Sequence, residues 1–290
     1  MKHLTHLSDE RWIAADVAGT GPAVLLLHGI PGAGAVWNGV RNRLAARHRV
    51  IAPDLVGFGH SARSADVRTL WADAQADAVL ALLDNLQASR VLVVGHDYGG
   101  PVAAHLLRKA PGRFAGLILA STNAFGDTPI EFPLSGIFWP AVGRVWARML
   151  FSAPSLRMMV RKGVGPDGPR IDPSVHVGDR DQARAIRVIF ETALRELATR
   201  YEPITDALRK VRVPTRVLWG DRDPLFPVPQ ARRTADLFEG ASLTLIPGAG
   251  HFLPEERPAE MAEAIAALWR SIGDGSGGAG SRAGISASAP

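Results

Sequence analysis

Apolar and polar residues follow one another along the chain in blocks that predict short buried strands separated by helices. The strands are expected at residues 23–27, 50–52, 91–94, 117–120, 215–219 and 242–246. Helices with one apolar face are expected at residues 71–86, 101–109, 230–238 and 258–272. Because the strands are continuously apolar rather than alternating, they indicate a mostly parallel central sheet with helices on both faces, which is an α/β fold.

The regular alternation stops after residues 119–122 and resumes at residues 213–215. The pattern between them is helical and irregular, and aromatic and methionine residues gather in its first half. Such an insertion is typical of a lid over an apolar pocket, although a small helical subdomain with its own core would have the same pattern. We therefore predict a core domain at residues 1–126 and 206–272 and a helical cap at residues 127–205. The Gly-, Ser- and Ala-rich tail at 273–290 has no apolar face and is predicted to be disordered.

Length and composition limit the classes of protein to consider. At 290 residues, 47% of them hydrophobic, the chain is long enough for one buried core and an insertion. It contains no cysteine, which excludes disulfides, thiolate catalysis and cysteine-ligated zinc. The first residues lack the apolar run of a signal peptide, and no run approaches the roughly 20 apolar residues of a membrane helix. We therefore expect a cytoplasmic protein that does not involve a membrane.

Charge and ligand spacing argue against several partners. The formal net charge is +5, but the basic residues are spread along the chain rather than gathered in runs that would track phosphates. The histidines His3, His6, His48 and His60 lack the spacing of metal ligands, and no Gly-x-Gly-x-x-Gly follows the first strand. We therefore expect no nucleic acid, no metal and no nucleotide cofactor.

The clearest chemical signal is an aspartate in a turn that usually carries a serine. Residues 95–100 read GHDYGG, with Asp97 at the centre, between the predicted strand 91–94 and the predicted helix 101–109. Strand, sharp turn and helix in this order are typical of a nucleophile elbow. A carboxylate that attacks an ester or amide would form an unstable mixed anhydride, whereas at a saturated carbon it forms an alkyl ester. Asp97 therefore predicts epoxides or alkyl halides as substrates.

A carboxylate nucleophile needs oxyanion donors, a base for water and a group that orients the base. The turn at residues 28–31 (HGIP) follows the first clear strand and could aim the Ile30 amide into the site; the Tyr98 amide would be the second donor. His251 follows the last predicted strand and is the expected base, and Asp223 follows the preceding strand and is its expected orienter. Nucleophile, acid and histidine thus occur in the order described for α/β-hydrolases.

Other acids remain open as the orienter. Asp221 also lies at the end of the strand 215–219, and Asp127 and Glu131 come soon after the strand 117–120. Asp223 is preferred to all three.

From about residue 21 to 272 the chain resembles the α/β-hydrolase superfamily, and within it the aspartate-nucleophile branch of epoxide hydrolases and haloalkane dehalogenases. The matching segments are 28–31 (HGIP), 53–59 (PDLVGFG), the elbow, 219–224 (WGDRDP) and 251–255 (HFLPE). The resemblance implies a two-step reaction. Asp97 displaces the leaving group, and His251, held by Asp223, then activates a water that hydrolyses the ester.

The residue that assists the leaving group is less clear. An epoxide leaves as a basic alkoxide and needs a proton donor, which related hydrolases supply from lid tyrosines, commonly two. This chain has two tyrosines in all, and only Tyr201 lies in the insertion; His176 and Tyr98 are alternatives. A halide instead needs N–H donors, which dehalogenases typically provide from a tryptophan directly after the nucleophile, the place of Tyr98 here. Trp139 or Trp146 could still donate from the lid.

These residues favour a cofactor-independent hydrolase that converts a small apolar epoxide and water to a vicinal diol. A haloalkane dehalogenase using the same triad is the alternative. A third hypothesis is a binding protein that keeps the fold without turnover. Retention of both the histidine and the acid argues against it.

Overall fold

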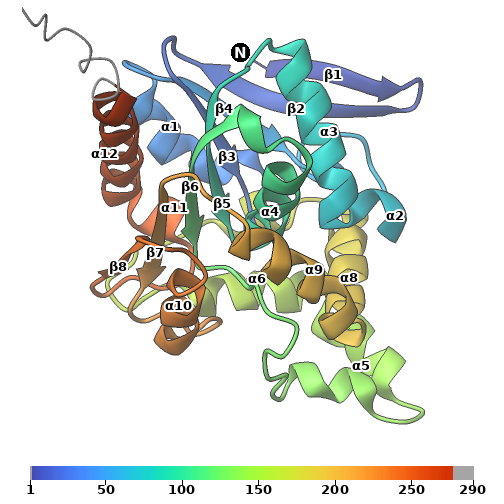
Figure 1. Ribbon diagram of the computed structural model, residues 1–290. Helices are drawn as coiled ribbons and strands as arrows, with labels where there is room; N and C mark the ends of the chain where they lie inside the picture. Colours follow the sequence, from blue (N-terminus) through green and yellow to red (C-terminus); the bar gives the residue numbers. More distant parts are fainter. Residues whose placement is uncertain (1, 277–290) are drawn as a thin grey trace, which may run out of the picture.

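The computed structural model describes residues 2–276 and is built around an eight-stranded sheet (Figure 1). The strand order is β1-β2-β4-β3-β5-β6-β7-β8. Strand β2 runs antiparallel to its neighbours β1 and β4. The strands β3, β4, β5, β6, β7 and β8 are mutually parallel. The strands are β1 (Lys2–Ser8), β2 (Arg11–Ala18), β3 (Ala23–Leu27), β4 (Arg49–Asp54), β5 (Val91–His96), β6 (Phe114–Ala120), β7 (Thr215–Gly220) and β8 (Ser242–Ile246).

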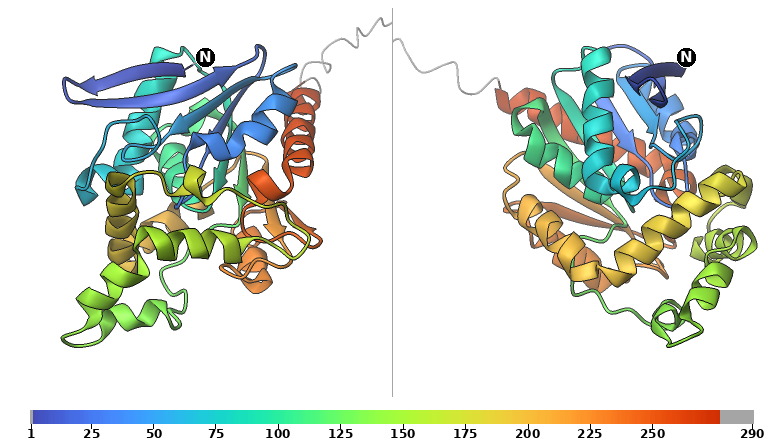
Figure 2. Two further views of the ribbon diagram at one scale, coloured as in Figure 1. Left: turned by 180° about the vertical axis from the view of Figure 1, so that it is seen from behind. Right: turned by 90° about the vertical axis from the view of Figure 1, so that its right-hand side faces the viewer.

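Helices cover both faces of the sheet (Figures 1 and 2). Those outside the insertion are η1 (Gly34–Trp37), α1 (Asn38–Leu44), α2 (Val67–Leu70), α3 (Ala72–Asn85), α4 (Gly99–Lys109), η2 (Pro111–Arg113), α10 (Val228–Ala235), α11 (Leu253–Glu256) and α12 (Pro258–Ser276). The insertion between β6 and β7 holds η3 (Leu134–Phe138), α5 (Gly143–Leu150), α6 (Ala153–Gly163), α7 (Pro173–His176), α8 (Arg180–Arg195) and α9 (Leu197–Arg209).

Continuously apolar strands serve two cores at once. Leu25 and Leu27 of β3 pack with α3 and α4 on one face, while Val24 and Leu26 pack with α1 and α12 on the other. Successive strand side chains point to opposite faces, so a strand covered on both sides must be apolar at every position. This arrangement confirms the predicted α/β fold, with a mostly parallel sheet and helices on both faces.

All six predicted strands are present, but the hairpin of β1 and β2 was not predicted. In β1 only Thr5 is buried, so its sequence lacks the apolar run that marks the other strands. The ends of some helices also differ from the prediction. Helix α12 continues through residues 273–276, which were assigned to the disordered tail; the rest of that tail lies outside the described residues.

The inserted helices lie beyond one end of the parallel strands (Figure 1). The longest of them, α8, contributes Ala185, Ile186 and Ile189 to the same buried cluster as β3 and β5. Helix α9 runs through residue 205, so the predicted boundary at 205/206 falls within a helix, and the division into core and cap stays a prediction. Among residues 2–276 no helix is long and apolar enough to cross a membrane.

Candidate active site

Asp97 occupies the sharp turn between β5 and α4, with a positive φ of 49°. Non-glycine residues seldom adopt this left-handed conformation, so it must be held in place by its surroundings. The Asp97 amide donates to the Ala120 carbonyl over 3.1 Å, and the Asp97 carbonyl accepts from the Gly100 amide over 3.0 Å and from Thr122 Oγ1 over 2.6 Å. These contacts fix the carboxylate at the end of the sheet, as a nucleophile elbow requires.

The turn after β3 brings one amide donor to this carboxylate. The Ile30 N–H donates to Asp97 Oδ1 over 2.6 Å. A β-carbon at Gly29 would lie 2.6 Å from the same oxygen, so glycine is needed for the turn to approach so closely. The Tyr98 amide, the second predicted donor, makes no hydrogen bond to Asp97 within residues 2–276 and stays a predicted donor for the reaction intermediate.

The predicted base and the predicted orienter meet beside Asp97. His251 Nδ1 donates to Asp223 Oδ2 over 3.0 Å, and His251 Nε2 lies 3.7 Å from Asp97 Oδ2. The other Asp223 oxygen accepts from the amides of Leu225 and Phe226 over 2.8 and 2.9 Å. With both oxygens held, Asp223 keeps the imidazole pointed at Asp97.

The alternative acids are engaged elsewhere. Asp221 accepts from the Gly248 amide over 2.8 Å, and Asp127 forms an exposed ion pair with Arg233. Neither has an interaction with His251 among those of the described residues. Of the acids considered, Asp223 is therefore the one that touches the base.

Two further residues, the predicted hydrogen-bonded spacer His96 and the unpredicted Glu256, hold the backbone of His251. His96 Nε2 donates to the His251 carbonyl over 2.8 Å. The buried carboxylate of Glu256 accepts from the amides on either side, Gly250 over 2.8 Å and Phe252 over 2.9 Å. A glutamate five residues after a histidine carries no distinctive signal, because its role depends on the loop folding back over it.

In the free protein, the neighbouring charges within the triad shift the protonation of His251 and Asp223. Burial alone would lower the pKa of His251, but the charge of Asp223, the hydrogen bond to it and the nearby Asp97 together raise it to about 10. Burial likewise opposes the charge on Asp223, yet the His251 imidazolium and the hydrogen bonds that Asp223 accepts lower its pKa. Burial lowers the pKa of the adjacent His96 to about 4. In the free protein, His251 is therefore the charged member of this histidine pair at neutral pH.

We expect the stability of the protein to fall between about pH 7 and pH 9. Folded His251 keeps its proton up to about pH 10, whereas the unfolded chain releases it near pH 6.5, so the stabilisation is complete below 6.5 and declines as pH rises. The loss is at most about 1.4 kcal/mol per pH unit, or roughly 3 °C in Tm. Thermal unfolding of wild type and His251→Gln across this range measures it, and equal slopes for the two proteins would contradict it.

A mainly apolar cavity of about 150 Å³ opens over Asp97. Its lining includes Leu134, Ile189, Phe190, Leu197 and Tyr201 from the insertion. A larger hollow of about 1030 Å³ lies between α2, η3, α5 and α8, but none of the triad residues lines it. The small cavity is thus the one in which a substrate would meet the nucleophile.

Tyr201 has the geometry of an available hydroxyl donor. It lies on α9, lines the same cavity as Asp97, and its hydroxyl has no hydrogen-bond partner within the described part of the chain. Burial and the charge of Asp97 raise its pKa, which keeps the proton on the oxygen. The Tyr98 hydroxyl instead donates to the Leu70 carbonyl over 2.7 Å, so it is not free to serve as an acid.

Three other predicted residues are not brought to the leaving group. His176 is buried against the turn at residues 28–31. Its Nδ1 lies 2.9 Å from the Pro31 carbonyl oxygen, and its Nε2 lies 2.6 Å from the Glu255 carboxylate. Trp146 donates its indole N–H to the Pro133 carbonyl, and Trp139 is 47% exposed and lines the outer hollow. The reason is local packing: the tryptophans stack on each other and on Phe132 at the outside of the insertion.

Within residues 2–276, no group of three or more His, Cys, Asp or Glu side chains is arranged to hold a metal ion.

Comparisons with known proteins agree with this architecture. The sequence model of the alpha/beta hydrolase family matches residues 24–264. An uncharacterised protein of Mycobacterium bovis is 30% identical over 260 residues, covering 86% of this chain and 75% of that protein. Haloalkane dehalogenase 2 of the same organism is 29% identical over 267 residues, covering 85% of this chain and 87% of that enzyme.

Solved structures of several hydrolases share the fold. A haloalkane dehalogenase of Bradyrhizobium elkani has a TM-score of 0.80 at 19% identity and covers 95% of this chain and 99% of its own. An esterase of Thermogutta terrifontis has a TM-score of 0.74 at 24% identity, with coverage of 94% and 99%. At such identities the likeness establishes the fold alone.

Proposed function

The chain belongs to the α/β-hydrolase family, and from this premise we propose that it hydrolyses a small apolar electrophile at a saturated carbon through a covalent ester on Asp97. The observation that carries the proposal is that the two carboxylate oxygens of Asp97 have different contacts. Oδ1 accepts from the Ile30 amide, whereas Oδ2 faces His251 at 3.7 Å. Oδ2 is therefore the attacking atom, and Oδ1 becomes the ester carbonyl already seated on an oxyanion donor.

The second step follows from the change in charge at Asp97. Once Asp97 is esterified it is neutral, so one of the two carboxylates that raise the pKa of His251 is lost. The imidazole can then give up its proton, to the Tyr201 phenolate after epoxide opening or to solvent after loss of halide, and accept one from a water that attacks the Asp97 ester. When the resulting intermediate collapses, the acyl C–O bond to the product breaks, the product oxygen takes up a proton and Asp97 returns to a carboxylate. The Ile30 amide stabilises the oxyanion on Oδ1, and Asp223 stabilises the imidazolium.

Among saturated electrophiles, we favour an epoxide that is opened to a vicinal diol. Ring opening needs a proton on the departing oxygen, and Tyr201 is a protonated, unpartnered hydroxyl in the cavity of Asp97. A halide would instead need N–H donors. None of the described residues that line this cavity is a tryptophan, and the side-chain amide of Asn123, which does line it, already donates to the Phe125 carbonyl over 3.1 Å.

A haloalkane is the second candidate, because a curated relative of similar length is named haloalkane dehalogenase 2. In that case the same Oδ2 attack would release halide and leave an alcohol after hydrolysis. The two candidates differ only in the group that receives the departing atom.

Labelling with ¹⁸O-water tests the covalent step that both candidates share. After a single turnover of wild-type enzyme, we expect one ¹⁸O atom in the Asp97 carboxylate and none in the newly formed hydroxyl of the product. Direct attack of water on the substrate would put the label in the product and leave Asp97 unlabelled. Mass spectrometry of product and protein separates these outcomes.

We expect Tyr201→Phe to slow epoxide opening by about a hundredfold or more, because the alkoxide would leave without its acid. Haloalkane turnover, if present, should change little. Tyr98→Phe is the matched control, since it removes a hydroxyl that already donates to the Leu70 carbonyl. Pre-steady-state formation of the Asp97 ester with each substrate is the measurement, and an unchanged epoxide rate in Tyr201→Phe would exclude Tyr201 as the acid.

A further inference from the structure

The outer end of the insertion exposes an unusual amount of apolar surface. Five large apolar residues there are about half exposed or more: Phe132 (65%), Trp139 (47%), Val142 (53%), Val145 (65%) and Met149 (54%). We call these five residues the apolar ridge. Apolar side chains gathered in this way on a protein surface usually mark a site that binds another protein, a ligand or a membrane.

Helix α5 places arginines directly beside the apolar ridge. Gly143 and Ala147 of α5 are buried, and successive residues of a helix lie about 100° apart around its axis. Arg144 and Arg148 are thus one turn apart on one exposed side. Val145 and Met149 are one turn apart about 100° further round. The helix therefore presents a basic edge and an apolar edge side by side.

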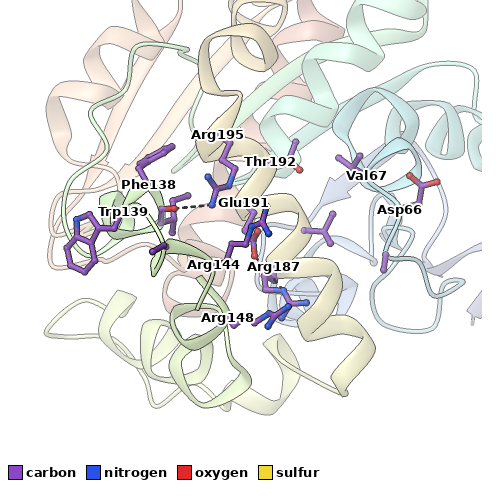
Figure 3. Close-up of a pocket in the computed structure, with 15 residues that line it drawn as sticks. Asp66, Val67, Phe138, Trp139, Arg144, Arg148, Arg187, Glu191, Thr192 and Arg195 are labelled. Carbon is purple, nitrogen blue, oxygen red and sulfur yellow. Dashed lines mark hydrogen bonds and ion pairs between the residues drawn. The ribbon is translucent and has the colours of Figure 1, made fainter. Parts of the chain in front are cut away.

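The basic edge opens into the large outer hollow shown in Figure 3. Four arginines line it: Arg144, Arg148, Arg187 and Arg195. Arg187 lies 3.6 Å from Glu191, and Arg195 donates to the Ile137 carbonyl over 3.0 Å (Figure 3). Arg144 and Arg148 have no ion-pair or hydrogen-bond partner within residues 2–276. The hollow thus carries uncompensated positive charge next to the apolar ridge.

We propose that this face docks on the surface of an anionic lipid bilayer. A bilayer would bind both parts of this face. Its acyl region would bury the apolar ridge, and its phosphates would pair with Arg144 and Arg148. Trp139 suits the same boundary, because an indole has a large apolar body and one N–H group. The absence of a membrane-spanning run, on which the sequence prediction rested, does not bear on such peripheral contact.

A second copy of the chain fits this face less well. A symmetric dimer through the apolar ridge would bring the same patch together from both subunits. The uncompensated arginines of one copy would then lie near those of the other, and like charges in a shared interface oppose association. Anionic lipid reverses the sign of that interaction. The proposal does not rest on the reaction catalysed at Asp97.

Flotation of the full-length protein with lipid vesicles tests this proposal. We expect binding to vesicles of equal parts phosphatidylcholine and phosphatidylglycerol, and at least about tenfold weaker binding to phosphatidylcholine alone or at high salt. Arg144→Gln/Arg148→Gln should weaken binding about twenty-five-fold, since each arginine near an anionic surface contributes about fivefold. Val145→Asp/Met149→Asp should weaken it by about tenfold or more.

Arg43→Gln/Arg47→Gln is the matched control, because both arginines are exposed and lie at α1 and just after it, far from α5 (Figure 1). This variant loses the same charge and should bind as wild type does. No binding of wild-type protein to anionic vesicles at low salt would overturn the proposal. Equal losses in the α5 and control arginine pairs would also overturn it. So would a concentration-dependent dimer in analytical ultracentrifugation that Val145→Asp/Met149→Asp abolishes.

Discussion

Asp97→Ala is expected to lower kcat by about ten-thousand-fold or more, whichever saturated electrophile proves to be the substrate. Alanine removes the atom that we propose bonds to the substrate carbon, and among the described residues no other carboxylate lines the cavity. Asp223 is turned away, with one oxygen on His251 and the other on the amides of Leu225 and Phe226. The measurement is substrate consumption at saturating concentration, with thermal unfolding as a check that the variant is folded.

Asp221→Asn provides the matched control for this loss. Asp221 lies near the same end of the sheet, and its Oδ1 accepts from the Gly248 amide, a contact that an asparagine oxygen preserves. We expect this variant to keep wild-type activity. A fully active Asp97→Ala would refute the nucleophile, and an inactive Asp221→Asn would reopen the choice of orienting acid.

The predicted site residues that the structure brings together all lie within short motifs at strand ends. Asp97, Asp223 and His251 follow β5, β7 and β8, and the carboxyl ends of parallel strands meet at one edge of the sheet. Chain order and strand prediction were therefore enough to bring the three side chains together. Ile30 follows β3 at the same edge, so its amide was predicted on the same grounds.

Residues of the insertion could not be placed in this way. The sequence indicates that Trp139, Trp146 and His176 lie in an apolar helical segment, but not which side of it each one faces. In the structure the tryptophans stack with Phe132 on the outside, and His176 turns towards Pro31 and Glu255. Side-chain direction there depends on how several helices pack against one another, which periodicity does not encode.

Edge strands and loop contacts were missed for related reasons. Strand β1 is stabilised by its pairing with β2 rather than by burial, so only one of its residues, Thr5, carries a core signal. Glu256 holds the loop around His251 by accepting from backbone amides, and any residue can supply such an amide. Contacts made through the backbone leave little trace in the sequence.

His251→Gln is expected to form the Asp97 ester but to hydrolyse it at least about a thousandfold more slowly than wild type. The first step needs Oδ2 of Asp97 and, for an epoxide, the proton of Tyr201, whereas the base for water is needed only in the second step. Glutamine keeps a polar side chain of similar length but cannot take up a proton at neutral pH. The variant should therefore consume one equivalent of substrate and then stop, with the protein heavier by the mass of the group bound to Asp97.

The chain itself allows this mass to be assigned to one residue. Trypsin cleaves after Arg90 and Arg108, and in the peptide between them Asp97 is the one side-chain carboxylate. An added mass on that peptide therefore identifies the nucleophile. The added mass also separates the two candidates, because an opened epoxide adds its full mass, whereas a haloalkane adds its mass less hydrogen halide.

His6→Gln, an exposed change on β1, is the control and should turn over normally and retain no adduct. If His251→Gln accumulated no ester while still consuming substrate, water would be attacking the substrate directly, and Asp97 would be acting as a base.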